Sequence, residues 1–337
     1  MNTLTEKTST TSRGFTYRYY ISGSGKGADI DKPALLFCHG FPETAHLWEP
    51  LLPFLRTVPH RLLIPDLLGF GGTLKPTEPW AYAYGEMVQD LLDICDAEGI
   101  SNVVPIGHDH GSGLAGRVYN YAPKRVMGLI LLNVGYQAPE RQKEFDIPAI
   151  NETSTKLFGY PILEYWNFFV TPDAAPIMQG NLERLWDCAH AGTFAEKQYL
   201  YCVPGAMRQY LTDPDVPRIS TKPYAADPEL KQRWMSQFQA GGLAGPLCWY
   251  TSRAMNIQLL SDKHMPDGRV VVRVPTLFIG CDEDVVCRPE LIKSPRDAGL
   301  LPNLTTHIME SVGHWPMYEN PGKTALLIRD FLYEKRL

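Results

Sequence analysis

The segment that most constrains this chain is the pentapeptide GHDHG at residues 107–111. An apolar run precedes it, and small residues that suit a helix follow it. A strand, a sharp turn and a helix of this kind form a nucleophile elbow, which exposes the central side chain at the top of a sheet. That residue is Asp109, and a carboxylate with an ordinary pKa of about 3.9 is already an anion at neutral pH. Asp109 can therefore displace a leaving group at a saturated carbon without a base to activate it.

Strand-like and helical stretches alternate around this elbow. Apolar runs predict strands at residues 17–21, 34–38, 61–65, 127–133, 270–279 and 305–309. Helical periodicity occurs at residues 48–55, 87–97 and 324–333. This alternation predicts the α/β class with a mostly parallel, doubly wound sheet, which binds ligands at the carboxyl ends of its strands. Pro105 lies inside the elbow strand and cannot donate a ladder hydrogen bond, so we expect the strand to end early or to bulge there.

Residues 137–267 interrupt the alternation with aromatic-rich helical stretches that Pro and Gly break up. We therefore predict a helical cap (lid) over residues 137–267, inserted into a core of residues 15–136 and 268–337. Residues 1–14 are polar and rich in Thr and Ser, so we expect a flexible N-terminal tail. The Gly/Ser segment at residues 22–27 predicts a hairpin turn.

Charge and composition exclude several classes of function. The net charge is −5 with opposite charges interspersed, and there is no basic stripe of the kind that binds nucleic acid. No apolar run approaches the roughly 18 residues of a membrane span, and the first residues lack the apolar core of a secretory signal. We expect a soluble protein that acts on a small molecule, without nucleic acid or membrane insertion, as a monomer or a homodimer.

Cysteine usage indicates the compartment. The seven cysteines are scattered, without CxxC pairs or zinc-type spacing, which favours reduced thiols in the cytoplasm. The last residues, Lys335-Arg336-Leu337, are similar to the peroxisomal S-K-L address but have lysine where a small residue belongs. A cytoplasmic location is therefore expected, with a peroxisomal one as the minor alternative.

The turn HGFP at residues 39–42 supplies a second element of a nucleophilic site. It directly follows the predicted strand at 34–38, where a backbone N–H can point into the site. The N–H groups of Phe41 and of His110, the residue after the nucleophile, would form an oxyanion hole. The turn alone is a weak signal, but its combination with the elbow is specific.

A general base and its orienting acid are expected late in the chain. His314 follows the predicted strand at 305–309 and is the histidine placed for the role of base. Asp284 is our choice for the acid that orients it, because it opens a loop after the preceding strand. Asp282 and Glu283, in the same loop, are the alternatives.

Two other motifs at the elbow suggest different chemistry. Residues 111–116 spell the G-x-G-x-x-G of dinucleotide sites, but the acid expected about twenty residues further on is replaced by Leu-Leu-Asn. We interpret these glycines as close helix-sheet packing. His108 and His110 flank Asp109 as metal ligands could, but further ligands at suitable spacing are lacking. We therefore expect no cofactor and no metal.

The order of these groups, with a helical insertion before the acid, resembles the α/β-hydrolase superfamily and, within it, the soluble epoxide hydrolases. The resemblance extends over nearly the whole chain from about residue 15. It becomes specific in two segments, YWNFFVTP at residues 165–172 and LCWY at residues 247–250. These match the segments that hold the two cap tyrosines of that family, which are Tyr165 and Tyr250 here.

The resemblance implies an α/β-hydrolase fold and a cofactor-independent epoxide hydrolase with a small or medium apolar epoxide and water as substrates. Asp109 would form a covalent ester while Tyr165 and Tyr250 hold the epoxide oxygen. His314, oriented by Asp284, would then activate water to release a vicinal diol. Residues next to these motifs are expected to contact the substrate: His39, Pro42, Trp166, Trp249 and Trp315.

Departures from the family pattern leave alternatives open. His110 stands where family members often have tryptophan. Trp166 after the first cap tyrosine also occurs in fluoroacetate dehalogenases, which otherwise have histidine in place of Tyr165 and arginines after the nucleophile. A haloalkanoate or haloalkane dehalogenase with the same Asp109 nucleophile is therefore the alternative function. A non-catalytic ligand-binding homologue is the alternative from another class, and a serine esterase is disfavoured because the elbow has no serine.

Overall fold

The computed structural model describes residues 1, 3–23, 31–139 and 141–337. These residues contain an eight-stranded sheet in the order β1-β2-β4-β3-β5-β6-β7-β8. The first two strands pair antiparallel, β2 pairs antiparallel with β4, and all later pairs are parallel. The predicted α/β class with a mostly parallel sheet is confirmed. The strands are β1 Thr5–Thr10, β2 Thr16–Ile21, β3 Ala34–Cys38, β4 Leu62–Pro65, β5 Val103–His108, β6 Leu129–Leu132, β7 Thr276–Cys281 and β8 Leu304–Met309.

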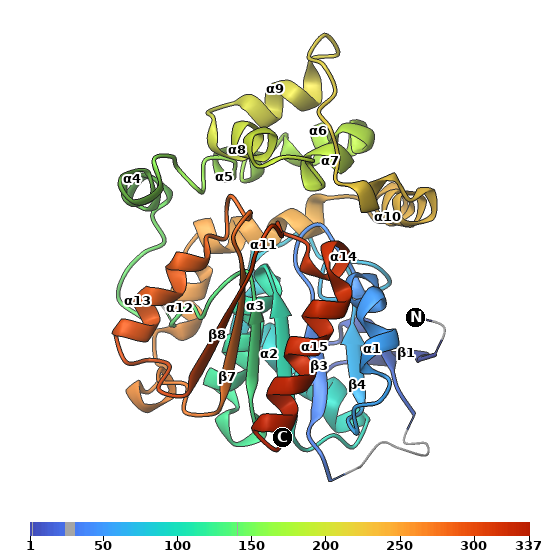
Figure 1. Ribbon diagram of the computed structural model, residues 1–337, viewed down its shortest axis with the longest axis vertical. Coiled ribbons are helices and arrows are strands. Elements are labelled where there is room, and N and C mark those ends of the chain that lie inside the picture. Colours follow the sequence, from blue (N-terminus) through green and yellow to red (C-terminus); the bar gives the residue numbers. More distant parts are fainter. Residues whose placement is uncertain (2, 24–30, 140) are drawn as a thin grey trace.

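Helices cover both faces of this sheet (Figure 1). Apolar residues of α2 and α3 pack on one face, and those of α1 and α15 pack on the other. Strand β3 is buried at every position because its side chains alternate between these two layers. The core helices are α1 Leu52–Leu55, α2 Tyr84–Ala97, α3 His110–Tyr121, α13 Lys293–Asp297, α14 Pro316–Glu319 and α15 Pro321–Glu334, with 3-10 turns η1 Ala45–Leu51, η2 Pro79–Tyr82, η3 Pro123–Arg125, η5 Asp267–Arg269 and η6 Pro289–Ile292.

A layer of helices from the middle of the chain lies over the carboxyl ends of the parallel strands (Figure 1). Its helices α4 to α10 stand apart from the core in the picture, whereas α11 contacts η2 and α12 contacts α2 of the core. The last two helices of the segment predicted as a cap therefore pack against the core. The elements are α4 Ile147–Phe158, α5 Trp166–Phe169, α6 Ala174–Gly180, α7 Leu182–Ala189, α8 Phe194–Cys202, α9 Ala206–Thr212, η4 Pro223–Ala226, α10 Pro228–Gly241, α11 Ala244–Ala254 and α12 Ile257–Asp262.

Indole N–H groups join the helical layer to the core. Trp234 of α10 donates to the carbonyl of Pro42 at 2.9 Å, and Trp315 of the core donates to that of Ala189 at 2.8 Å. Each donor and acceptor is buried, so each bond is shielded from competing water. The two bonds therefore tie the helical layer to the core.

The N-terminal segment corrects one prediction. The segment predicted as a flexible tail contains a strand, because β1 pairs with β2 from Thr5 opposite Ile21 to Thr10 opposite Thr16. Its side chains are polar and mostly exposed, so the strand lies at the sheet edge without the apolar alternation that signals a strand. The turn predicted over residues 22–27 lies mostly outside the described residues.

Two strand predictions in the core also need correction. The seventh strand begins at Thr276, whereas the apolar pattern predicted a start at residue 270. Strand β5 neither ends nor bulges at Pro105 and continues to His108. On the side of β6, Val103 forms an isolated bridge with Val126 and regular pairing resumes at Ile106, so the proline lies between these two paired positions.

Candidate active site

The elbow between β5 and α3 holds Asp109 in a strained conformation with φ 55°. The turn is possible only because glycines flank it. A Cβ on Gly111 would lie 2.0 Å from the carbonyl oxygen of Cys38, and one on Gly107 would lie 2.3 Å from that of Gly111. At Gly111 the helix therefore packs directly on the neighbouring strand, as predicted, whereas a Cβ on Gly113 or Gly116 would meet side chains of Tyr84 or Tyr136. Asp109 directly follows His108, the last residue of β5, and so lies at the carboxyl end of this strand.

The carboxylate of Asp109 is held by backbone donors. The N–H of Phe41 donates to Asp109 Oδ1 at 3.0 Å, and the backbone N–H of His110 also stabilises the carboxylate. Burial opposes ionisation, but the charges of His110 and His314 hold the pKa of Asp109 below its ordinary value. Asp109 is therefore an anion at neutral pH, with both predicted oxyanion donors beside it.

His314 lies between the nucleophile and a buried acid. Its Nδ1–H donates to Asp284 Oδ2 at 2.6 Å, and its Nε2 lies 3.9 Å from Asp109 Oδ2. The second distance is too long for a hydrogen bond but leaves Nε2 directed at the carboxylate. His108 holds the loop that carries His314, because its Nε2–H donates to the carbonyl oxygen of His314 at 2.7 Å.

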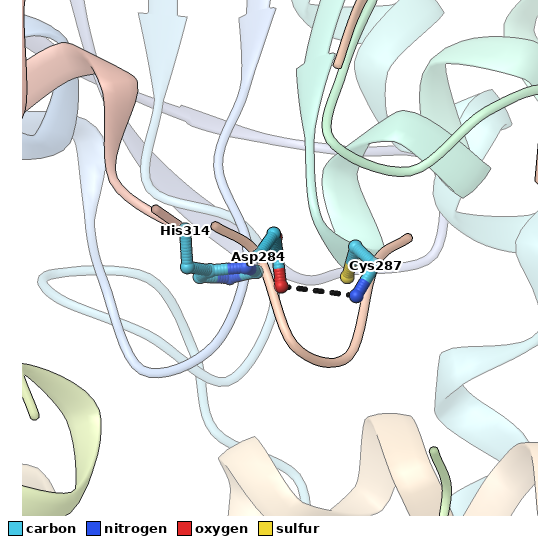
Figure 2. A group of neighbouring side chains, drawn as sticks. All are labelled: Asp284, Cys287 and His314. Atoms are coloured by element: carbon cyan, nitrogen blue, oxygen red, sulfur yellow. Dashed lines mark hydrogen bonds and ion pairs between the residues drawn. The ribbon is translucent and has the colours of Figure 1, made fainter. Parts of the chain in front are cut away.

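Asp284 is fully buried, and its two oxygens are saturated with donors. The backbone N–H groups of Val286 and Cys287 each donate to Oδ1 at 3.0 Å, and Figure 2 shows the bond from Cys287. The side chain of Asn133 donates to Oδ2 at 2.7 Å, beside His314. Burial disfavours the charge, but the charge and hydrogen bond of His314, the charge of Lys197 and the N–H of Cys287 hold the pKa of Asp284 far below its ordinary range. The structure thus brings Asp284, and neither alternative acid, to His314.

Asn133 is a site residue that the sequence reasoning missed. It directly follows β6 with φ 61° and also contacts the carbonyl of Gly313 at 3.3 Å. Its position at the carboxyl end of a strand next to that of Asp284 was the available signal.

One group of side chains among the described residues has the spacing of metal ligands. Asp284, Cys287 and His314 each have a ligand atom within 4.8 Å of the others (Figure 2). The hydrogen bonds described above already use both oxygens of Asp284, so a cation would have to displace them. The imidazole of His108 packs against His314, whereas that of His110 packs against Tyr250, so the two do not converge on one ion.

Two phenols face the nucleophile from the helical segment. Tyr165 precedes α5 and Tyr250 lies on α11, and their rings are 6.1 Å apart at 80°. Both line the same small cavity as Asp109. Burial, with the nearby negative charge of Asp109, raises the pKa of each phenol well above its ordinary value. Both hydroxyls therefore keep their protons and can donate them to a developing alkoxide.

Two cavities meet at Asp109 and Tyr165. The larger, about 250 Å³, is mostly apolar and is lined by residues including Phe145, Ile162 and Trp166. The smaller, about 30 Å³, lies on the His314 side and is lined in part by Phe41, Pro42 and Trp315. Three of the predicted substrate contacts, Pro42, Trp166 and Trp315, thus face a cavity.

The family model described as alpha/beta hydrolase fold matches residues 33–321, which is most of the chain. The chain belongs to this family. The predicted α/β-hydrolase fold is therefore confirmed, and the elbow, the acid and the histidine of this α/β-hydrolase all lie within the matched region. Among the described residues no helix combines the length and the apolarity that crossing a membrane requires.

Relatives of this α/β-hydrolase are named epoxide hydrolases. Bifunctional epoxide hydrolase 2 of Mus musculus is 27% identical over 305 residues, which are 89% of this chain and 51% of that protein, so the chain spans about half the length of this relative. Epoxide hydrolase 1 of Siraitia grosvenorii is 27% identical over 326 residues, which are 93% of this chain and 94% of that protein. The crystal structure of Epoxide Hydrolase A from Mycobacterium thermoresistibile has a TM-score of 0.78 at 23% identity and covers 98% of each chain, which shows a shared fold. The predicted resemblance to epoxide hydrolases is confirmed.

Two residues predicted as substrate contacts lie outside both cavities of this α/β-hydrolase. His39 is fully buried, because its Nε2 accepts from the N–H of Leu67 at 2.9 Å and its Nδ1–H donates to the carbonyl of Gly40 at 3.0 Å. Trp249 donates its indole N–H to the carbonyl of Leu68 at 2.9 Å and packs behind His110. Neither lines the two cavities. His39 shapes the oxyanion turn, and Trp249 attaches α11 to the core.

Proposed function

We propose that this chain hydrolyses an apolar epoxide to a vicinal diol through a covalent ester on Asp109. The observation that carries the proposal is the convergence of an anionic carboxylate and two protonated phenols on one small cavity. A carboxylate attacks carbon, and phenols stabilise an oxygen that leaves as an alkoxide. The names of the relatives agree with this chemistry.

In the first half of the reaction, an Asp109 oxygen attacks one epoxide carbon and the bond from that carbon to the epoxide oxygen breaks. Tyr165 and Tyr250 bind that oxygen, and one of them gives it a proton. The products are a hydroxyalkyl ester and a tyrosinate. Esterification removes the negative charge of Asp109 that helps to raise the pKa of both phenols, and an alkoxide is a stronger base than a phenolate, so the proton moves to the epoxide oxygen.

In the second half, water attacks the carbonyl carbon of the ester. His314 takes a proton from that water through Nε2, and Asp284 stabilises the imidazolium through Nδ1. The N–H groups of Phe41 and His110 bind the oxyanion that forms. The tetrahedral intermediate then collapses and expels the second diol oxygen, which takes the proton from His314. The carboxyl proton that remains on Asp109 returns the tyrosinate to its neutral form by way of solvent.

The test is to stop the reaction between its halves. His314→Gln should still form the ester but not hydrolyse it, so incubation with styrene oxide should add the mass of the whole epoxide to the peptide that contains Asp109. Asp109→Ala is the control and should show neither adduct nor turnover. If the His314→Gln variant binds styrene oxide and Asp109 stays unmodified, the proposal is wrong.

The same experiment separates the alternatives. A haloacid dehalogenase would release chloride or fluoride and form an adduct only with halogenated substrates. A non-catalytic homologue would bind ligand stoichiometrically and form no adduct with either class. Phenols at both cap positions favour the epoxide, because its oxygen stays in the product and needs a proton, whereas a halide leaves as the anion.

A further inference from the structure

A buried lysine reaches the reaction centre from the helical layer. Lys197 lies on α8, one turn before Tyr201, and a capping box of Thr193 and Glu196 starts this helix. Its side chain points between the aromatic rings, with Nζ 5.5 Å from the ring centre of Tyr201 and 6.0 Å from that of Trp315. Lys197 is only 8% exposed and lines the small cavity.

The charge of this lysine lacks a direct partner. The ammonium group of Lys197 forms no ion pair and no hydrogen bond with any residue that the structure describes, whereas its backbone N–H donates to the carbonyl of Thr193 at 3.1 Å. Asp284 and Glu319 are the carboxylates whose charges act most strongly on Lys197, but each of them is bonded to other groups. Asp284 accepts from His314 and three other donors, and Glu319 pairs with Lys222 at 3.0 Å and accepts from the N–H of Gly313 at 2.9 Å.

A buried ammonium group without an anion is costly, because it has lost its hydration and gained only aromatic faces in return. The cavity that Lys197 lines also contains Asp109, Tyr165, Tyr250 and His314. A substrate held for attack by Asp109 would therefore extend one substituent toward the ammonium group. An anionic substituent there would form a charge-assisted hydrogen bond and offset the repulsion from Asp109.

We infer that Lys197 makes the small cavity a carboxylate subsite, so that the preferred substrates are epoxides with a carboxylate on one ring carbon and an apolar group on the other. This inference rests on the proposed epoxide hydrolysis. The small cavity of about 30 Å³ is large enough only for a small polar group beside the reacting ring. The larger one, about 250 Å³, exceeds the roughly 150 Å³ that accommodates benzene in an engineered cavity. An oxirane-2-carboxylate with a 3-phenyl group fits this division.

The first test measures binding and does not depend on turnover. Calorimetry compares cinnamate with cinnamamide, which has nearly the same shape but no charge. The wild-type protein should bind cinnamate at least about tenfold more tightly, as expected for a hydrogen bond to a charged group. Lys197→Met should abolish this preference, and Lys197→Arg should retain part of it. Lys231→Met removes a cap lysine outside both cavities and should leave the preference unchanged.

The second test measures kcat/KM for 3-phenyloxirane-2-carboxylate and for the matching carboxamide. The wild-type enzyme should favour the carboxylate by about tenfold or more, and Lys197→Met should lose activity on the carboxylate alone. Equal losses on both substrates would show that Lys197 only supports the fold or the charge of Asp284, and would overturn the inference. So would a wild-type enzyme without any preference, whether or not the variant folds.

The two proposals fail in different ways. If cinnamate is preferred through Lys197 but neither epoxide is hydrolysed nor forms an ester, epoxide hydrolysis is wrong and the carboxylate subsite stands. Release of halide from a 2-halo carboxylate would then assign the subsite to the dehalogenase alternative. If styrene oxide forms the Asp109 ester but no carboxylate is preferred, the subsite is wrong and the proposed hydrolysis stands.

Discussion

Replacing Asn133 would show how strongly Asp284 depends on a residue outside the proposed triad of Asp109, His314 and Asp284. Its side-chain N–H donates to the buried Asp284 carboxylate at 2.7 Å, and a hydrogen bond to a charged group contributes about 1.5–3 kcal/mol. Its φ of 61° lies in the left-handed region, where an ordinary Cβ costs roughly 1–2 kcal/mol and glycine much less. Asn133 already carries a Cβ at this φ, so Asn133→Ala loses chiefly the hydrogen bond and should lower the free energy of unfolding by about 1.5–3 kcal/mol.

Urea unfolding followed by circular dichroism separates the two contributions. Asn133→Gly relieves the backbone strain but still lacks the hydrogen bond, so it should be about 1 kcal/mol more stable than Asn133→Ala. The pair Asn256→Ala and Asn256→Gly, at φ 59° and away from the triad, supplies the backbone difference by itself. Equal stability of the two Asn133 variants would refute the backbone contribution. A loss below about 1 kcal/mol in both would refute the contribution of the hydrogen bond.

Turnover gives the functional readout for the same variants. Asp284 keeps its two backbone donors and His314 when Asn133 is replaced. We therefore expect kcat for styrene oxide to fall about tenfold rather than to vanish, which corresponds to a modest misplacement of a catalytic group. Complete loss of activity in a folded Asn133→Gly variant would show that these other contacts do not position Asp284.

Three further outcomes follow from the site. Single-turnover ester formation should keep a constant rate between about pH 5 and pH 9. The pKa of Asp109 lies below its ordinary value near 3.9, and the pKa of each phenol lies above its ordinary value near 10. A titration within this interval in stopped-flow measurements would contradict the prediction. Tyr165→Phe and Tyr250→Phe should each slow ester formation by about 10²-fold, as for loss of one general acid, while hydrolysis of a preformed ester stays unchanged; slowing of hydrolysis alone would reverse the assignment. Trp166→Phe should raise KM for aryl epoxides, because Trp166 lines the larger cavity, whereas Trp249→Phe should lower thermal stability, because it loses the bond to Leu68. A KM effect seen only in Trp249→Phe would show that Trp249 contacts the substrate.

The sheet and the chemical groups could be predicted because their signals are local. The elbow is specified by five consecutive residues whose glycines the turn requires. His314 and Asp284 follow strands that apolar runs disclose, and the order of parallel strands brings their ends together. Strand β1 was missed for the opposite reason, since an exposed edge strand of polar residues lacks a periodic apolar face.

The direction of individual side chains could not be predicted. His39 and Trp249 adjoin site residues in sequence, yet both use their ring nitrogens to bond carbonyl or N–H groups of the core. Asn133 and Lys197 reach the site only through the packing of β6 against β7 and of α8 over the sheet. A lysine on a helix is usually solvated, and only the tertiary structure shows that Lys197 is not.

The two phenols belong to parts of the molecule that are attached differently. Tyr250 lies on α11, which Trp249 fastens to the core, whereas Tyr165 belongs to the layer of α4 to α10. Asp109, Asp284 and His314 all lie in the core, as do both oxyanion N–H groups. If the helical layer moved away from the core, the epoxide would lose the proton donor Tyr165, but all the groups proposed for ester hydrolysis would stay together. Under the proposed mechanism, ester formation therefore needs the helical layer in place, whereas ester hydrolysis draws on core residues alone.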